Sequence, residues 1–227
     1  MNKNQLTEQE IRTQFITPAI KNAEWTDSQV REEYAITKGR IIARGGSYKR
    51  DKAKYADYIL FYKPHIPLAV VEAKDNNHAI GDGMQQAMDY ADRLRIPFVF
   101  TSNGDGFTFR NRIDSSEKVI ELTEFPSPDT LWDIYKRNEG IDEQQEQVVM
   151  QPYYVERPDK QPRYYQFNAI NMTVDAVIKG QDRALLVMAT GTGKTYTAFQ
   201  IIWRLWKAGV AKVAITLHLH MSWVTIF

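Results

Sequence analysis

The sequence has 227 residues, of which 43% are hydrophobic and 25% are charged, as in an ordinary globular protein, and its formal net charge is +1. Any affinity for nucleic acid must therefore come from local patches, and no segment approaches the roughly 18 apolar residues of a membrane span. Cysteine is absent and no signal peptide follows Met1, so disulfides and thiolate zinc sites are excluded and we expect a cytoplasmic protein with no membrane partner.

The first half of the chain predicts helix, strands, helix and strands, an α/β order. The first helix has Thr7 as a plausible N-cap and apolar residues on one side. The expected elements are a helix over 7–23, strands over 30–36 and 40–43, a flexible basic loop within 38–54, strands over 57–62 and 67–74, a helix over 80–94, and strands over 97–101 and 107–110 around a turn at 103–106.

The composition changes after Glu121, where prolines and a run of Glu and Gln indicate a polar connector with one short helix over 131–136. A second α/β unit is predicted to begin near Arg163. Its elements are a helix over 166–178, a strand over 184–188, a glycine loop and a helix over 195–207. The predicted parts are a domain over 1–125, a linker over 126–162 and a second domain over 163–227.

The strands 57–62 and 67–74 predict a β-hairpin that carries two acids and a lysine. If the turn is centred between Pro64 and His65, Asp57 lies opposite Glu72, and Lys74 shares a face with Glu72. Unpaired charge at the end of an apolar strand costs several kcal/mol, which a magnesium ion bound by both carboxylates and a backbone carbonyl would offset. Lys74 would orient or deprotonate an attacking water. A structural salt bridge among the three side chains explains the spacing equally well.

This pattern resembles a known nuclease motif. Asp57 followed by Glu72-Ala73-Lys74 is similar to the PD-(D/E)xK motif, with Ala56 in place of the proline. The sequence resembles the N-terminal region of type I restriction endonuclease R (motor) subunits up to about residue 212, most clearly at 7–12, 55–58, 71–74 and 103–104. The resemblance implies a restriction-endonuclease-like mixed sheet flanked by helices and Mg²⁺-dependent cutting of double-stranded DNA. It also implies modification and specificity subunits as partners, and ATP-driven translocation before cutting.

The same resemblance suggests further site residues. Gln86 and Tyr90 match a Gln-x-x-x-Tyr element and would both face the scissile phosphate as neutral donors, although ordinary packing and solvation are the alternative. The first helix of related nucleases brings a glutamate to the metal, and Glu8 is favoured over Glu10, while exposed helix acids compete with this interpretation. The basic stretch predicts a DNA-contacting surface rather than a merely solvated face. Its residues are Lys38, Arg40, Arg44, Lys49, Arg50 and Lys52.

A second motif, Ala189 to Thr195, lies between an apolar strand and a helix, which is the context of a phosphate-binding loop. Gly191, Thr192 and Gly193 would present backbone N–H groups to phosphate, Lys194 would reach the β- and γ-phosphates, and Thr195 would bind magnesium. Met188 stands where a strict motif has glycine. The loop resembles motif I of superfamily 2 helicases, and Gln166 resembles their adenine-reading glutamine, which implies an ATP site in an incomplete RecA-like lobe.

The end of the sequence departs from that family from Thr216 onward. Few residues follow Lys194, and no acidic Walker B strand or arginine finger is present. We therefore expect an aberrant tail, from truncation or a frame shift, and a chain that neither hydrolyses ATP efficiently nor translocates. His218 and His220 have the spacing of a metal pair, but an unstructured end is favoured. The competing hypotheses for the whole chain are a module that docks DNA or partner subunits without cutting, and a nuclease of another ATP-dependent restriction or repair system.

Overall fold

The computed structural model describes residues 3–37, 41–44, 47–50, 54–155, 162–210, 215–217 and 223–226, with backbone alone at 37, 41–44, 47–50, 215–217 and 223–226. The chain divides into two compact units, residues 1–139 and 140–227. Each is described here by itself. Within the described ranges, no helix is long and apolar enough to cross a membrane.

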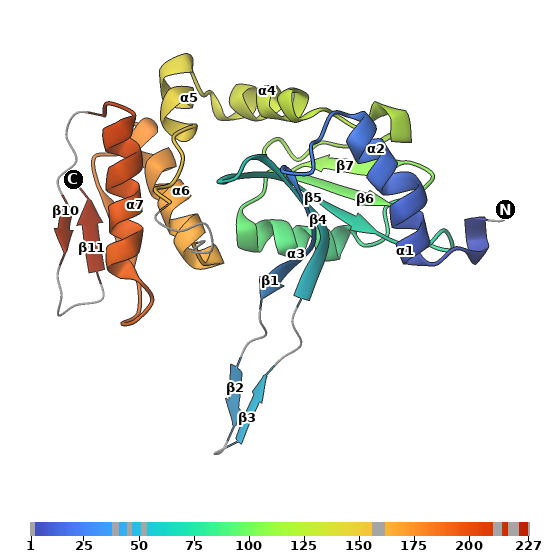
Figure 1. The fold of residues 1–227 in the computed structure, drawn as a ribbon, viewed down its shortest axis with the longest axis horizontal. Helices are drawn as coiled ribbons and strands as arrows, with labels where there is room; N and C mark the ends of the chain where they lie inside the picture. The colour runs from blue at the N-terminus through green and yellow to red at the C-terminus, as the bar shows by residue number, and fades with distance from the viewer. Residues whose placement is uncertain are drawn as a thin grey trace. The chain divides into compact units, whose positions relative to one another are not determined.

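The first unit is built on a six-stranded mixed sheet in the order β1-β4-β5-β6-β7-β8 (Figure 1). Its strands are β1 (Val30–Thr37), β4 (Lys54–Lys63), β5 (Ile66–Ala73), β6 (Phe98–Ser102), β7 (Phe107–Asn111) and β8 (Glu117–Ile120), with a separate antiparallel pair β2 (Ile41–Arg44) and β3 (Ser47–Arg50). Its helices are η1 (Lys3–Gln5), α1 (Glu8–Ile11), η2 (Arg12–Ile16), α2 (Thr17–Asn22), α3 (Met84–Leu94), η3 (Leu122–Glu124) and α4 (Pro128–Glu139).

The predicted α/β class and most of the predicted elements of this unit are confirmed. Two expectations need correction. The strand expected over 40–43 is present as β2, but residues 47–50, expected within the flexible basic loop, form a second strand, β3, that pairs with it. The helix expected over 131–136 is present but longer, from Pro128 to Glu139, and it lies within the first compact unit.

The predicted helix over 7–23 is present, but it consists of an α, a π and an α segment. Thr7 is the N-cap: its hydroxyl accepts the Glu10 N–H, and the Glu10 carboxylate accepts the Thr7 N–H, a capping box. The π stretch is marked by the Thr17 N–H, which donates to the Arg12 carbonyl five residues earlier. Pro18 has no N–H to donate, and a proline ring clashes with the carbonyl of an ordinary α-turn. The wider π-turn directly before Pro18 avoids this clash, so the proline explains why the helix changes to a π-turn here.

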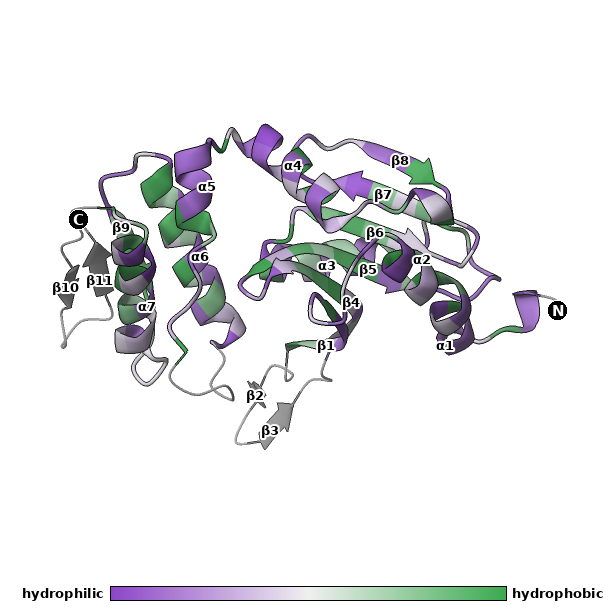
Figure 2. Ribbon diagram, turned by 45° about the horizontal axis from the view of Figure 1, so that its top comes forward, coloured by the Kyte–Doolittle hydropathy of each residue, from purple (hydrophilic) through white to green (hydrophobic). Residues whose placement is uncertain are grey.

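The β4–β5 hairpin has the predicted register. Tyr58 pairs with Val71 and Leu60 with Ala69, and the turn consists of Pro64 and His65 alone. Both strands carry long buried apolar runs, and Figure 2 shows hydrophobic residues along β4 and β6. The hairpin therefore lies in the centre of the sheet, and its register is fixed because a slip of one residue would exchange buried for solvent-facing side chains.

The only parallel neighbours among the described strands are β5 and β6. A parallel pair needs a crossover, and α3 supplies it by packing on both strands. The polypeptide leaves β5 just after Ala73 and enters α3 at Met84, so the end of β5 and the start of α3 come together on one side of the sheet.

The second unit contains α5 (Glu143–Val149), α6 (Tyr164–Ile178), β9 (Ala184–Val187), α7 (Lys194–Lys207), β10 (Ile215–Leu217) and β11 (Trp223–Ile226). Helices α6 and α7 pack through an apolar cluster that includes Ile170, Val174, Ile201 and Leu205. Residues 143–149, expected in a polar connector, form a helix. Strand β9 pairs antiparallel with β11, so the parallel sheet of a RecA-like lobe is not seen among the described strands.

Candidate active site

The site lies where strands β4 and β5 stop pairing. The last residue pair is Tyr58 with Val71, which places Asp57 opposite Glu72, as predicted. The next backbone donor of β5, the Ala73 N–H, bonds to the Asp57 Oδ2 at 2.8 Å. The Asp57 carboxylate thus takes the place of a backbone carbonyl of β4 as the acceptor for this N–H. The hydrogen bond fixes the carboxylate beside the end of β5.

Glu72 is a buried acid with one satisfied and one unsatisfied oxygen. It is 2% exposed, and its Oε1 accepts hydrogen bonds from Lys74 Nζ at 3.2 Å and from Gln86 Nε2. Its Oε2 is buried and has no hydrogen-bond partner among the described residues. Burial raises the pKa of Glu72 to about 7, and repulsion from Asp57 adds to the rise, while Lys74 opposes it.

Lys74 lies between two acids. Its Nζ is 3.2 Å from Glu72 Oε1 and 3.8 Å from Glu8 Oε2, and it also donates to the Ala73 carbonyl at 2.9 Å. Burial alone would lower the pKa of Lys74, but the charges of Glu72 and Glu8 outweigh it and raise the pKa above its usual value. The side chain is therefore an ammonium ion, suited to orient a water or balance negative charge rather than to remove a proton.

Of the two glutamates considered on the first helix, Glu8 lies at the site. Its carboxylate faces Lys74, and burial, the largest cause, raises its pKa. The Glu10 carboxylate is used in the capping box with Thr7, which lowers the pKa of Glu10. The first turn of the helix thus directs one acid to the site and one to its own N-terminus.

Helix α3 borders the site with Gln86 and Tyr90, which lie one turn apart. The amide nitrogen of Gln86 donates to Glu72 Oε1 and to the Tyr90 hydroxyl, the latter at 2.9 Å. The helix begins after Gly83, whose φ of +90° suits glycine. A Cβ at this residue would lie 3.1 Å from Lys74 Cε and 3.3 Å from Glu72 Cγ. The positive φ and the close approach of α3 to both side chains therefore both favour glycine at this position.

These oxygen donors fit a hard divalent cation. The Asp57 carboxylate keeps lone pairs beyond its two contacts, and the unpartnered Oε2 of Glu72 is a buried acceptor that lacks a donor or a cation. Within the described part of the chain, however, no three His, Asp or Glu side chains already form a metal-binding group. Glu8, expected as the third ligand, faces Lys74 instead.

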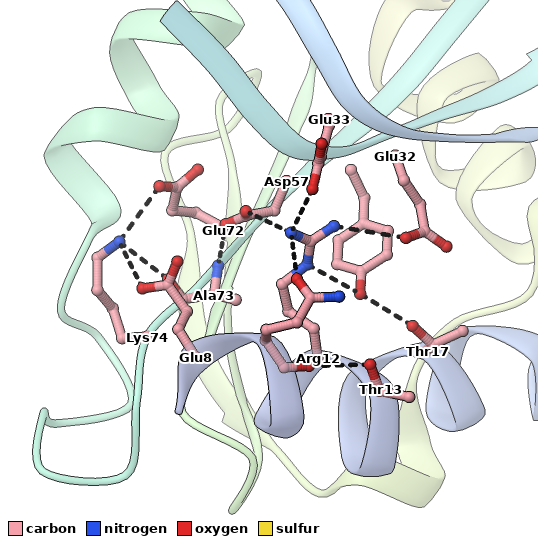
Figure 3. A network of polar contacts seen from close by, with 12 residues as sticks. Glu8, Arg12, Thr13, Thr17, Glu32, Glu33, Asp57, Glu72, Ala73 and Lys74 are labelled. Atoms are coloured by element: carbon pink, nitrogen blue, oxygen red, sulfur yellow. Dashed lines mark hydrogen bonds and ion pairs between the residues drawn. The ribbon is translucent and has the colours of Figure 1, made fainter. Parts of the chain in front are cut away.

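Arg12 is a site residue that sequence reasoning missed. Its guanidinium is buried and contacts Asp57, Glu32 and Glu33 as well as the Tyr58 hydroxyl (Figure 3). The available signal was its place on the apolar side of the first helix, next to Ile11 and one turn after Glu8. A cation among buried side chains needs an acidic partner.

The predicted phosphate loop joins β9 to α7. Two side chains that were predicted to bind nucleotide, Lys194 and Gln166, form hydrogen bonds within the chain. Lys194 Nζ donates to the Met188 carbonyl at 3.1 Å. The Gln166 amide donates to the Thr192 carbonyl at 2.8 Å and accepts the Arg163 N–H at 2.9 Å. Gly193 has a φ of +83°, and a Cβ there would lie 2.3 Å from Gln166 Nε2. The structure thus brings Gln166 against the loop.

Three other loop residues were predicted to bind nucleotide. Gly191 has a positive φ of 78°, Thr192 Oγ1 donates to the Ala189 carbonyl at 2.5 Å, and Thr195 is exposed in the first turn of α7. Because β9 precedes the loop and α7 follows it, the loop has the predicted strand–loop–helix setting.

The predicted DNA-contacting residues are not brought to the site by any described contact. Lys38, Arg40 and Lys52 lie outside the described residues, as do His218 and His220. Arg44, Lys49 and Arg50 lie in β2 and β3, where the backbone alone is described.

Two protein families match this chain, and each match lies within one of the two compact units. Residues 7–126 match the family described as "Type I restriction enzyme R protein N terminus (HSDR_N)", and residues 159–222 match "Type III restriction enzyme, res subunit". The chain is 52% identical to the Type I restriction enzyme EcoAI endonuclease subunit of Escherichia coli over 92% of its own length and 26% of that protein. It is 26% identical to the EcoKI endonuclease subunit of Escherichia coli strain K12 over 88% of its own length and 21% of that protein.

A solved structure gives the same result. A fragment described as an HsdR subunit of a type I restriction enzyme from Vibrio vulnificus superposes with a TM-score of 0.79 and 39% identity, over 89% of this chain and 38% of that one. The chain spans about a quarter of the length of the curated relatives it matches. Because the match to the R-protein N-terminus covers more than half of its residues, the chain belongs to the family of type I restriction enzyme R subunits.

Proposed function

We propose that the first unit is a PD-(D/E)xK nuclease domain that hydrolyses phosphodiester bonds of double-stranded DNA with Mg²⁺. The observation that carries the proposal is the meeting of Asp57, Glu72 and Lys74 at the end of the hairpin, with Glu72 Oε2 buried and unpartnered. A structural salt bridge alone does not account for that oxygen, because a purely structural cluster would satisfy each buried acceptor.

Asp57 and Glu72 would hold the cation, and the Ala73 carbonyl is a further oxygen donor beside them. Glu8 would join them by exchanging its contact with Lys74. When bound, magnesium supplies Lewis-acid chemistry, making water more acidic and offsetting negative charge on a phosphate oxygen. The raised pKa of Glu72 means that this acid gives up its proton most readily when a cation replaces it.

The remaining side chains would act on water and phosphate. Lys74 would donate a hydrogen bond that orients the attacking water and would balance the charge that develops on the phosphate. Gln86 and Tyr90 present neutral donors from α3 and would position the scissile phosphate without adding charge. Together these groups suit in-line attack of water on phosphorus: the new P–O bond forms as the P–O bond to the opposite sugar oxygen breaks, the water proton passes to solvent, and solvent protonates the departing sugar oxygen.

We infer that the second unit binds ATP through Gly191, Gly193, Lys194 and Thr195, with Gln166 close to the loop. Binding would require Lys194 to leave the Met188 carbonyl for phosphate oxygens. The similarity to R subunits further supports a role in a complex with modification and specificity subunits, in which ATP-driven translocation precedes cutting. The basic segment that includes β2 and β3 would hold the duplex.

Plasmid cleavage tests the proposal. The whole chain is incubated with supercoiled plasmid at a series of Mg²⁺ concentrations, as wild type, Asp57→Asn, Lys74→Ala and, as a control, Lys21→Ala, which removes an exposed ion pair with Asp27. We expect nicking by wild type and the control, and its loss in the other two variants. Nicking that persists in Lys74→Ala would contradict the proposed site. DNA binding without cutting at any Mg²⁺ concentration would favour a docking module.

A further inference from the structure

Arg12 is a buried cation for which the proposed function so far gives no role. It is 6% exposed and begins the π stretch η2, one helical turn after Glu8. Its guanidinium contacts Asp57 at the end of the hairpin, and Figure 3 shows it between Asp57 on one side and Glu32 on the other.

The partners of Arg12 differ in burial. Nη2 lies 3.4 Å from Glu32 Oε2 and Nη1 lies 3.5 Å from Glu33 Oε1, but these acids are 51% and 70% exposed. Nη1 also lies 3.4 Å from Asp57 Oδ1, and the Asp57 side chain is only 15% exposed. Water screens the first two pairs and leaves the third largely unscreened, so Asp57 is the partner on which Arg12 acts most strongly.

The other contacts hold the guanidinium itself in place. Arg12 Nε donates to the Tyr58 hydroxyl at 3.4 Å, and that hydroxyl is 2.9 Å from Thr17 Oγ1 on α2. Nη1 also donates to Gln9 Oε1 at 3.3 Å. Contacts from the helix and from two strands thus restrict a long side chain that would otherwise occupy many rotamers.

Asp57 is consequently held on both oxygens. The Ala73 N–H binds Oδ2 and Arg12 binds Oδ1, so the plane of the carboxylate is determined by two separate elements. A carboxylate has about four lone-pair positions, and these two contacts leave the others for a cation. Without Arg12, one backbone contact would remain, and the carboxylate could rotate about it.

We propose that Arg12 is a positioning residue that presets the Asp57 carboxylate for a divalent cation. The proposal rests on the proposed nuclease function, because it assigns Asp57 to the cation. Outer-shell partners of metal ligands typically affect metal affinity by about 10–100-fold. The alternative is a structural tie between the first helix and the sheet, which would act on stability without changing the affinity for the cation.

Mn²⁺ binding, followed by electron paramagnetic resonance of the whole chain at one fixed pH, distinguishes the two roles. The variants are Arg12→Gln, Arg12→Lys, Asp57→Asn and, as a control, Glu32→Gln, which removes a holding partner but keeps the Asp57 contact. We expect Mn²⁺ binding to weaken about tenfold or more in Arg12→Gln, to weaken to a smaller extent in Arg12→Lys, and to stay near wild type in Glu32→Gln. Arg12→Lys keeps a buried cation but not the planar fork, so it remains informative if Arg12→Gln does not fold.

A Mg²⁺ titration of plasmid cleavage adds a second measurement. Positioning predicts that Arg12→Lys needs more Mg²⁺ to reach half of its maximal rate, whereas a structural role would lower the maximal rate without moving that midpoint. Mn²⁺ affinity in Arg12→Lys equal to wild type would overturn the assignment of Arg12 alone, provided that Asp57→Asn abolishes binding. Mn²⁺ binding that is absent from wild type, or unaffected by Asp57→Asn, would overturn the proposed cation site and the role of Arg12 together.

Discussion

Replacing Glu72 by glutamine should remove a pH-dependent decrease in the free energy of unfolding, measured without divalent cations. Glu72 has an ordinary pKa of 4.5 when exposed and a pKa of about 7 in the folded chain. Below pH 4.5 the acid is protonated in both states and has no effect. Between these values only the unfolded chain releases the proton, so the free energy of unfolding falls as the pH rises, and above pH 7 the full cost is present.

The size of the effect follows from the same two values. Each pH unit between them corresponds to about 1.4 kcal/mol, so the full cost is roughly 3 kcal/mol, and most of it develops between pH 5 and pH 8. Glutamine has no charge at either pH. It leaves a buried amide N–H without an acceptor, a cost of about 1–3 kcal/mol that does not change with pH. The difference between the two pH values therefore isolates the ionisation of Glu72.

Urea unfolding, followed by tryptophan fluorescence in the presence of EDTA, measures this difference. Between pH 5 and pH 8 the wild type should lose about 2–3 kcal/mol more than Glu72→Gln. Glu117→Gln, which changes an exposed acid paired with Arg110, serves as a control and should behave as wild type. Adding Mg²⁺ at pH 8 should stabilise wild type and not Glu72→Gln. Parallel pH dependence in wild type and Glu72→Gln would refute the account of a buried, ionising Glu72.

Three further predictions concern other parts of the chain. Gly83→Ala should lower plasmid cleavage about tenfold or more while DNA binding in a gel-shift assay is kept, because the added Cβ would push on Lys74 and Glu72. Lys194→Ala should weaken binding of a fluorescent ADP analogue, measured by anisotropy, by at least about tenfold, whereas Lys179→Ala should not. Arg204→Met should lower the free energy of unfolding in urea by about 3 kcal/mol, because the Val149 and Gln151 carbonyls would lose a buried donor.

The features that the sequence predicted well are local. The hairpin register follows from two apolar runs separated by a short turn, so Asp57 and Glu72 could be placed opposite each other before the fold was known. The strand–loop–helix order around residues 189–195 was likewise predictable, because the strand, the glycine loop and the helix follow one another directly. In both cases the residues that define the geometry lie within about 20 positions of one another.

In two segments a local signal predicts the structure and the composition does not. Gly45-Gly46 between two β-prone runs is a hairpin signal, whereas glycine content alone predicts a flexible loop. Asp142 followed three residues later by Gln145 is a capping box, and it begins a helix inside the segment expected to be a connector. Turn chemistry in the first segment and capping chemistry in the second therefore predict the structure better than composition does.

Arg12 could not be placed by local reasoning, because its partners come from distant strands. Asp57 is far away in sequence, and Glu32 and Glu33 lie on β1, which pairs with β4 at the other edge of the hairpin. These ion pairs depend on where the first helix lies against the sheet, because Arg12 is on the helix and its acidic partners are on β1 and β4. An isolated sequence contains no record of that placement.

The two proposed sites differ in how far the chain itself satisfies their polar groups, and this difference has consequences for binding. In the phosphate loop Lys194 already bonds to the Met188 carbonyl, so a nucleotide must exchange one hydrogen bond for another and gains only the difference. At the hairpin Glu72 keeps a buried oxygen without a donor, so a cation removes an existing cost as well as forming new bonds. Cation binding at the hairpin should therefore be coupled to stability far more strongly than nucleotide binding at the loop.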